Sequence, residues 1–170
     1  MSTSNQFDSI VEAYADDLYR YAYYLCGNRH NAEDLVQETF TLGWRAFHQL
    51  REITAAKAWL IKTMRREHYK RAPVAESMGL EDLEGIDFTA FDAPLDHADR
   101  LDIEFKLRSL SAVSREVLLL QLLFGYSTQE ISQLLSIGET AVCSRLHRAR
   151  ARLAGKKNAE LAEFTKWMAK

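Results

Sequence analysis

The sequence predicts an all-α protein of two small helical domains joined by an acidic flexible linker, the C-terminal domain being a helix-turn-helix. Apolar residues recur at three- and four-residue steps in both halves, no segment alternates as a strand does, and the periodicity stops in an acidic middle stretch. An apolar fraction of 47% in 170 residues is sufficient for folded cores. The expected boundaries are 1–73 for the first domain, 74–100 for the linker, 101–155 for the second domain and 156–170 for a tail.

Three amphipathic helices are expected in the first domain. The first has an apolar stripe from Phe7 to Leu25, and Gly27 is expected to end it. The second begins at Asn31, whose side chain is of the type that caps helix N-termini, and the acids that follow favour a helix start. The apolar stripe of this second helix consists of Val36, Phe40, Trp44 and Phe47.

The third helix is expected from Thr54 to Arg71, and Pro73 ends it. Its expected core residues are Ala58, Leu60, Ile61 and Met64. Its outer face mixes cations with aromatic rings, namely Trp59, Lys62, Arg65, Arg66, His68, Tyr69 and Lys70. Aromatic faces stack on unpaired bases while cations follow the phosphate backbone, so this face is typical of single-stranded nucleic-acid binding. Trp59 is equally compatible with a place in the core.

The second domain contains a helix-turn-helix over Thr128–Leu153, preceded by a helix that Gly125 is expected to end. Ser127 and Glu130 have the spacing of a capping box, and Gly138 is expected to take the left-handed conformation in the turn. The last helix has an apolar stripe of Val142, Leu146, Ala149 and Leu153. Its other positions carry Ser144, Arg145, His147, Arg148, Arg150 and Arg152. Such a helix enters the major groove, where Arg bonds guanine; the alternative is a solvated basic helix in an ordinary bundle.

The net charge of −2 hides a strong pattern along the chain. Two basic stretches, 57–71 and 140–157, flank an acidic stretch, 76–99, that has no Lys or Arg. The second helix also carries a polar stripe made of Asp34, Gln37, Glu38, Thr41 and Arg45. This stripe is either a solvated helix face or a protein-docking surface, and the charge pattern is compatible with both.

Four motifs stand in a fixed order along the chain: Ala32–Phe40 (AEDLVQETF), the Trp59-Leu60 pair at the head of a basic helix, Ser114–Val117 (SREV) and Ser144–Arg150 (SRLHRAR). In this order and spacing the chain resembles the extracytoplasmic-function (ECF) sigma factors, the small two-domain members of the main bacterial sigma family. The resemblance covers nearly the whole chain except the linker, the first few residues and the tail after Gly155. Several motifs in register are far more specific than a single helix-turn-helix.

The resemblance implies a role for each surface. Docking on the clamp coiled coil of core RNA polymerase is implied for Asp34, Leu35, Gln37 and Glu38. Melting and reading of the promoter −10 element is implied for Trp59, Lys62, Arg65, Arg66, Tyr69 and Lys70, together with the loop at 49–54. Contact with the −35 element is implied for Ser144, Arg145, His147, Arg148 and Arg152. The polymerase flap, promoter DNA and an anti-sigma factor are the further partners that the resemblance implies.

Three positions depart from the family's usual residues. Arg66 stands where members often carry an Asn that takes part in capturing a flipped −10 base. Cys143 stands where Lys or Arg is usual, and Ser136 stands in the turn where Gly is common. A promoter sequence is therefore not carried over from the family.

The composition argues against other classes. Two distant cysteines and five scattered histidines have no metal-ligand spacing, and no nucleophile motif or phosphate-cradling loop occurs, so neither an enzyme nor a cofactor or metal is expected. The apolar runs fall far short of the roughly 20 residues that span a bilayer, and the N-terminus lacks a secretory signal, so a cytoplasmic protein without membrane insertion is expected. Two alternatives stay open: a conventional helix-turn-helix regulator, which leaves Ala32–Phe40 unexplained, and a sigma-like decoy that sequesters an anti-sigma factor.

Overall fold

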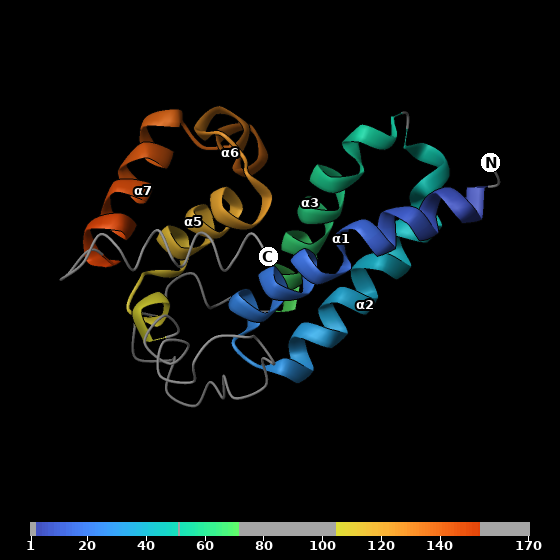
Figure 1. The fold of residues 1–170 in the computed structure, drawn as a ribbon, viewed down its shortest axis with the longest axis horizontal. Coiled ribbons are helices and arrows are strands. Elements are labelled where there is room, and N and C mark those ends of the chain that lie inside the picture. Colours follow the sequence, from blue (N-terminus) through green and yellow to red (C-terminus); the bar gives the residue numbers. More distant parts are fainter. Residues whose placement is uncertain (1–2, 51, 72–104, 154–170) are drawn as a thin grey trace. The chain divides into compact units, whose positions relative to one another are not determined.

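The computed structural model describes residues 3–50, 52–71 and 105–153, and within these residues every regular element is a helix (Figure 1). The predicted all-α fold class is therefore confirmed. The chain divides into two compact units, Met1–Ser77 and Met78–Lys170. The linker at 74–100 and the tail at 156–170 lie outside the described residues, and the finer domain boundaries stay predictions.

The first unit is a three-helix bundle. Its helices are α1 (Thr3–Cys26), α2 (Arg29–Ala46) and α3 (Ala56–Arg71), and two short 3-10 turns, η1 (Phe47–Gln49) and η2 (Ile53–Ala55), lie between α2 and α3. α1 packs along α2, and both helices contact α3 (Figure 1). The buried side chains between them include Phe7, Ile10, Leu18, Tyr21, Leu35, Leu60, Ile61 and Met64.

The junction between α1 and α2 is tighter than the sequence predicts. Gly27 has a left-handed φ of 77°, and its amide donates to the carbonyl of Tyr23 at 2.8 Å, so α1 ends as expected. The N-cap of α2, however, is Asn28 and not Asn31: the Asn28 side chain accepts a hydrogen bond from the Asn31 amide at 2.9 Å. The prediction was wrong because the left-handed glycine reverses the chain in one residue, which lets the next helix start three residues earlier.

The core-facing stripe of α2 also differs from the predicted one. The residues of α2 that are buried are Ala32, Leu35, Thr39 and Gly43. Of the predicted stripe only Phe47, in η1, is buried; Val36 and Phe40 are half-buried, and Trp44 is 49% exposed. The inward face is offset by one residue because it is lined by small side chains, which let the neighbouring helices approach closely.

Two polar or small residues make this close approach possible. The buried hydroxyl of Thr39 donates to the carbonyl of Leu35 at 2.7 Å, so it stays hydrogen-bonded inside the core. A methyl group added to Gly43 would lie 3.3 Å from the Leu60 side chain, which is tighter than ordinary contact, and 3.4 Å from the Phe7 ring. Phe7 in turn makes an edge-to-face contact with the exposed Trp44, with centroids 5.3 Å apart.

α3 starts at Ala56, two residues after the predicted start, because Ile53–Ala55 forms the turn η2. The predicted core residues Leu60, Ile61 and Met64 are buried, as expected. Ala58 is only half-buried, since it lies beside the core face and not on it.

The second unit contains α5 (Ala112–Phe124), α6 (Thr128–Leu135) and α7 (Glu139–Leu153), with a short helical stretch at 105–108 before them. α7 packs against both α5 and α6. Gly125 ends α5 in the left-handed conformation, at φ 69°, as predicted. The capping box is confirmed as well: the Glu130 carboxylate accepts from the Ser127 amide at 2.8 Å, and the Ser127 hydroxyl accepts from the Glu130 amide at 3.2 Å.

The turn between α6 and α7 places its left-handed residue at Ser136, which has φ 55° and ψ 43°. The prediction that Gly138 takes this conformation was wrong, because the chain reverses at the end of α6 and not at the start of α7. Gly138 instead occupies the position before the first residue of α7, and its carbonyl accepts from the amides of Ala141 and Val142 in the first turn of that helix. The Ser132 hydroxyl donates to the Ile137 carbonyl at 2.6 Å and stabilises the turn.

Candidate nucleic-acid interface

The outward face of α7 is held rigidly by its core stripe. Val142, Leu146, Ala149 and Leu153 are all buried, as predicted. The opposite positions Ser144, Arg148 and Arg152 are exposed, and Arg145 is half-buried. The Nε atom of Arg148 donates to the Ser144 carbonyl one turn earlier at 3.3 Å, so these two residues lie on the same side of the helix. Glu139 in the first turn is the one acidic residue of α7, which leaves this face strongly cationic.

Arg150 differs from the other cations of α7. Arg150 donates from Nη2 to the Gln121 side chain of α5 at 2.5 Å, so this cation contributes to the fold of the unit. His147 is exposed and flanks the face. Cys143 is exposed, which excludes a place in the core for this departure from the family's usual Lys or Arg.

α3 carries the second basic surface. Lys62, Arg66 and Lys70 are exposed, whereas Trp59, Arg65 and Tyr69 are half-buried. The Arg65 guanidinium lies over the Tyr69 ring, 5.3 Å from its centroid, in a cation–π contact. Because Trp59 is half-buried, it is neither a core residue nor a fully exposed ring at the helix surface.

Glu67 is a functional candidate that the sequence reasoning missed. It is the one acidic residue among the sixteen of α3, and it is buried, with only 7% of its surface exposed. Its Oε1 atom accepts hydrogen bonds from Arg66 Nε and from Lys70 Nζ, each at 3.0 Å, and Oε2 accepts from Lys70 Nζ at 3.3 Å. The hydrogen bonds from Lys70 lower the pKa of Glu67 against the opposing effect of burial, and the hydrogen bond from Arg66 lowers it further, so the carboxylate is ionised.

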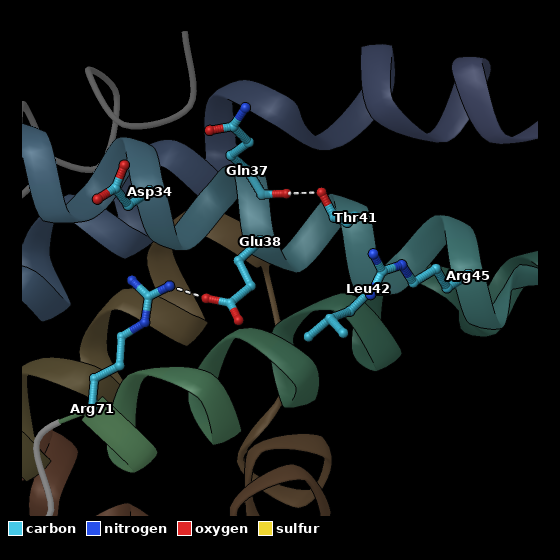
Figure 2. A pocket seen from close by; sticks show the side chains of 7 residues that line it. All are labelled: Asp34, Gln37, Glu38, Thr41, Leu42, Arg45 and Arg71. Carbon is cyan, nitrogen blue, oxygen red and sulfur yellow. Dashed lines mark hydrogen bonds and ion pairs between the residues drawn. The ribbon is translucent and has the colours of Figure 1, made fainter.

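The polar stripe of α2 lines an open hollow together with the end of α3 (Figure 2). Its lining residues are Asp34, Gln37, Glu38, Thr41, Leu42, Arg45 and Arg71. The Arg71 guanidinium forms an ion pair with the Glu38 carboxylate across the two helices. Asp34 lies 3.6 Å from the His30 ring nitrogen one turn earlier on the same helix.

Leu35 does not belong to this surface. The resemblance groups it with Asp34, Gln37 and Glu38, but its side chain is fully buried because it is part of the offset core face of α2. Leu35 therefore supports the stripe from beneath and has no exposed surface for a partner. Leu42 is the apolar residue of this surface, and it was not among the predicted docking residues. Its position four residues after Glu38 places it on the same face of α2, and this spacing could have identified it.

The described residues contain no group of three or more His, Cys, Asp or Glu side chains that would hold a metal ion. The Cys26 thiol lies 3.7 Å from His68 Nδ1, and burial raises the pKa of this thiol to about 11. Within the part of the chain that the structure describes, no helix is long and apolar enough to cross a membrane.

The fold and the two basic surfaces define a class of protein: a helical nucleic-acid-binding protein with a helix-turn-helix in one unit and a second basic helix in the other. The family model described as Sigma-70 region 2 matches residues 10–72, and that described as Sigma-70 region 4 matches residues 100–153. The chain belongs to the ECF sigma factors of bacterial RNA polymerase. This confirms the family resemblance, and members of this family are transcription initiation factors and not enzymes.

Individual relatives agree with this assignment. The chain is 33% identical to the ECF RNA polymerase sigma factor SigL of Mycobacterium tuberculosis over 146 residues, which cover 83% of this chain and 82% of SigL. It is 32% identical to SigE of Mycolicibacterium smegmatis over 154 residues, which cover 86% of this chain but span only 60% of SigE.

Two solved structures have a similar fold. The sigma factor RpoE of Bartonella quintana, in complex with the anti-sigma factor NepR, matches with a TM-score of 0.70 and 28% identity over 86% of this chain and 93% of that one. CnrH, in complex with the cytosolic domain of CnrY, has a TM-score of 0.62 and 24% identity over 87% of this chain and 84% of that one, a likeness of fold alone.

Proposed function

We propose that this sigma factor binds core RNA polymerase through the polar stripe of α2 and reads promoter DNA with two separate helices, α3 at the −10 element and α7 at the −35 element. The observation that carries this proposal is the presence of one exposed basic helix on each of two units, each backed by a well-packed core. A single operator-binding domain would need only the second of these surfaces.

The −35 element is assigned to α7. Ser144, Arg145, His147, Arg148 and Arg152 are the residues proposed to contact it. Exposed arginines on the second helix of a helix-turn-helix reach guanine edges in the major groove and the phosphates beside them. The hydrogen bond from Arg150 to Gln121 of α5 directs this guanidinium toward α5, which supports leaving Arg150 out of this set.

The −10 element is assigned to α3. Trp59, Lys62, Arg65, Arg66, Tyr69 and Lys70 are the residues proposed to melt and read it. Exposed cations beside aromatic rings are suited to a single strand, whose bases stack while its phosphates meet the cations. The Arg65–Tyr69 contact supports this assignment because it keeps a cation and a ring together at the helix surface.

Polymerase docking is assigned to Asp34, Gln37 and Glu38, with the clamp coiled coil as the surface that receives them. The three side chains lie on one face of α2, and Leu42 and Arg45 extend that face toward the C-terminal end of the helix (Figure 2). The second unit is proposed to contact the polymerase flap. Each DNA reader is weak alone, since a good bidentate base contact gives about 1–3 kcal/mol of discrimination. Holding both readers on one polymerase makes the second binding event intramolecular and multiplies their effect.

An anti-sigma factor is proposed as the regulatory partner. This proposal is supported by the similar structure of RpoE, in which that sigma factor is bound to the anti-sigma factor NepR. The cytoplasm is proposed as the location, because core polymerase and promoter DNA are the partners.

The test is transcription in vitro with purified core polymerase and a randomised promoter library. The chain should direct initiation from a subset of promoters, whereas a conventional regulator or a decoy should not. Asp34→Arg should abolish co-purification with core polymerase, because it reverses a charge on the proposed docking face. Glu12→Arg, which makes the same reversal at an exposed position of α1, is the matched control. Normal polymerase binding by Asp34→Arg would remove the docking assignment.

A further inference from the structure

Glu67 is an unusual residue for a helix that binds nucleic acid. It brings a negative charge into the centre of the basic surface of α3, four residues from its C-terminal end at Arg71. Its side chain is only 9% exposed, whereas those of Arg66 and Lys70 are 60% and 62% exposed. The carboxylate therefore lies beneath two cations that face solvent.

Stability alone gives a poor account of this arrangement. Ion pairs with exposed cations add little to stability because water screens them, and the burial of a carboxylate itself opposes folding. The carboxylate also lowers the positive charge of a surface that is proposed to bind an anionic strand. A role in orienting Arg66 and Lys70 accounts both for the burial of the carboxylate and for the reduced positive charge of the surface.

The geometry shows what the carboxylate fixes. Oε1 is shared by the two cations at equal distances of 3.0 Å, and Lys70 reaches Oε2 as well, so the ammonium and the guanidinium are held side by side. Arg66 is bound through Nε, which leaves the four N–H groups of its two terminal nitrogens for another acceptor. A guanidinium held in this way presents a planar donor edge in one direction, which is what bidentate recognition requires.

We propose that Glu67 is a positioning residue for promoter reading: its buried carboxylate holds Arg66 and Lys70 in one geometry, so that this pair discriminates among bases and does not simply follow any phosphate within reach. This inference rests on the proposed function of α3 at the −10 element. It also gives a physical account of Arg66, which stands where many family members carry Asn: a flexible Arg gains direction from the carboxylate beneath it.

The experiment uses the full chain bound to core polymerase and a promoter selected with the unaltered protein. Glu67→Gln keeps the shape of the side chain and removes its charge, and Glu12→Gln removes the same charge from an exposed position of α1. Two readouts are taken for each: the affinity ratio between the selected −10 single strand and permuted sequences, and the salt dependence of binding to a permuted strand. A merely structural role for Glu67 changes thermal stability but neither readout.

Glu67→Gln is expected to lower the affinity ratio about fivefold or more, and Glu12→Gln to leave it unchanged. Because one internal counter-charge is lost, the slope of log K against log salt should steepen by about 0.7, the value for one additional phosphate contact on a single strand. In a chain that already carries Arg66→Gln and Lys70→Gln, Glu67→Gln should have no further effect on the ratio. A folded Glu67→Gln protein with an unaltered ratio and slope would overturn the inference.

If Glu67→Gln does not fold, Lys70→Gln decides the question, because Lys70 contacts both carboxylate oxygens and lies at the surface. It should lower the affinity ratio, and equal weakening on all sequences would refute the positioning role. A chain that fails to bind core polymerase removes the proposed function and this inference with it. Normal initiation together with unchanged discrimination removes the inference alone.

Discussion

The turn of the helix-turn-helix contains a residue whose backbone conformation opposes its own side chain. Ser136 adopts φ 55° and ψ 43° between α6 and α7, and among the described residues it is the one non-glycine residue with a positive φ. In this conformation the Cβ atom crowds the following carbonyl oxygen, which costs roughly 1–2 kcal/mol in an L-residue. Replacing Ser136 with Gly removes that crowding and should stabilise the second unit.

The magnitude follows from two opposing contributions. Relief of the left-handed strain favours the Ser136→Gly protein by roughly 1–2 kcal/mol. The greater backbone freedom of glycine in the unfolded chain opposes this by about 0.5–1 kcal/mol. The net expectation is a gain of about 0.5–1 kcal/mol in the free energy of unfolding of this unit.

Amide hydrogen exchange measured by mass spectrometry suits this prediction because it reports each unit separately. Peptides from α6 and α7 should exchange about two- to fivefold more slowly in Ser136→Gly, since about 1.4 kcal/mol corresponds to a factor of ten. Peptides from α1, α2 and α3 should exchange at unchanged rates and act as the internal reference.

Two glycines of the same unit provide matched controls. Gly125 also has a left-handed φ, 69°, and a Cβ atom added there would meet no atom within 4 Å, so Gly125→Ser should accelerate exchange through backbone strain alone. Gly138 is equally open, lies outside the left-handed region and directly precedes α7, where Ser caps a helix at least as well as Gly, so Gly138→Ser should be neutral or slightly stabilising. Faster exchange in Ser136→Gly, or the same direction of change in Ser136→Gly and Gly125→Ser, would refute the reasoning.

Three further predictions concern the buried leucine of α2, the recognition helix and the two thiols. Leu35→Ala should lower the free energy of unfolding of the first unit by about 2–5 kcal/mol in a urea titration followed by tryptophan fluorescence, whereas Asp34→Arg should leave it nearly unchanged; the reverse result would place Leu35 at the surface. Arg148→Ala should weaken promoter binding by holoenzyme by about 1–3 kcal/mol and leave polymerase binding intact, and a promoter without a −35 element should show no difference in transcription in vitro. Cys143 should react with iodoacetamide at pH 8 long before Cys26, because burial raises the pKa of Cys26 to about 11 and keeps its thiol protonated. The stability that the fold gains from keeping this thiol neutral is fully present below the ordinary thiol pKa and is lost as the pH rises toward 11. Equal labelling of both cysteines at pH 8 in mass spectrometry would contradict this prediction.

The sequence predicted those features that depend on neighbours along the chain. The capping box of Ser127 and Glu130 and the apolar stripe of α7 were correct, because both depend on fixed spacings within one helix. The N-cap of α2 was placed three residues late because Asn28 and Asn31 are equally good caps by type, and the left-handed Gly27 decides between them.

Features that depend on packing between helices were not predictable in this way. Periodicity gave weight to the large residues of α2, but the face that packs is lined by small ones such as Thr39 and Gly43, so the expected stripe was offset by one residue. The ion pair between Arg71 and Glu38 joins two helices through residues that lie 33 positions apart in the sequence, so no local pattern predicts it. The burial of Glu67 likewise depends on the bundle beneath it, which composition does not reveal.

Gly43 allows α2 to lie close to Leu60 of α3 in the first unit. A single methyl group at this position would require Leu60 to shift by a few tenths of an ångström, and the basic residues of α3 follow Leu60 on the same rigid helix. The close approach of α2 to Leu60 of α3 thus depends on the absence of one carbon atom. A series of larger residues at position 43 would therefore act as a graded spacer, and initiation measured along it would reveal how much misalignment promoter opening tolerates.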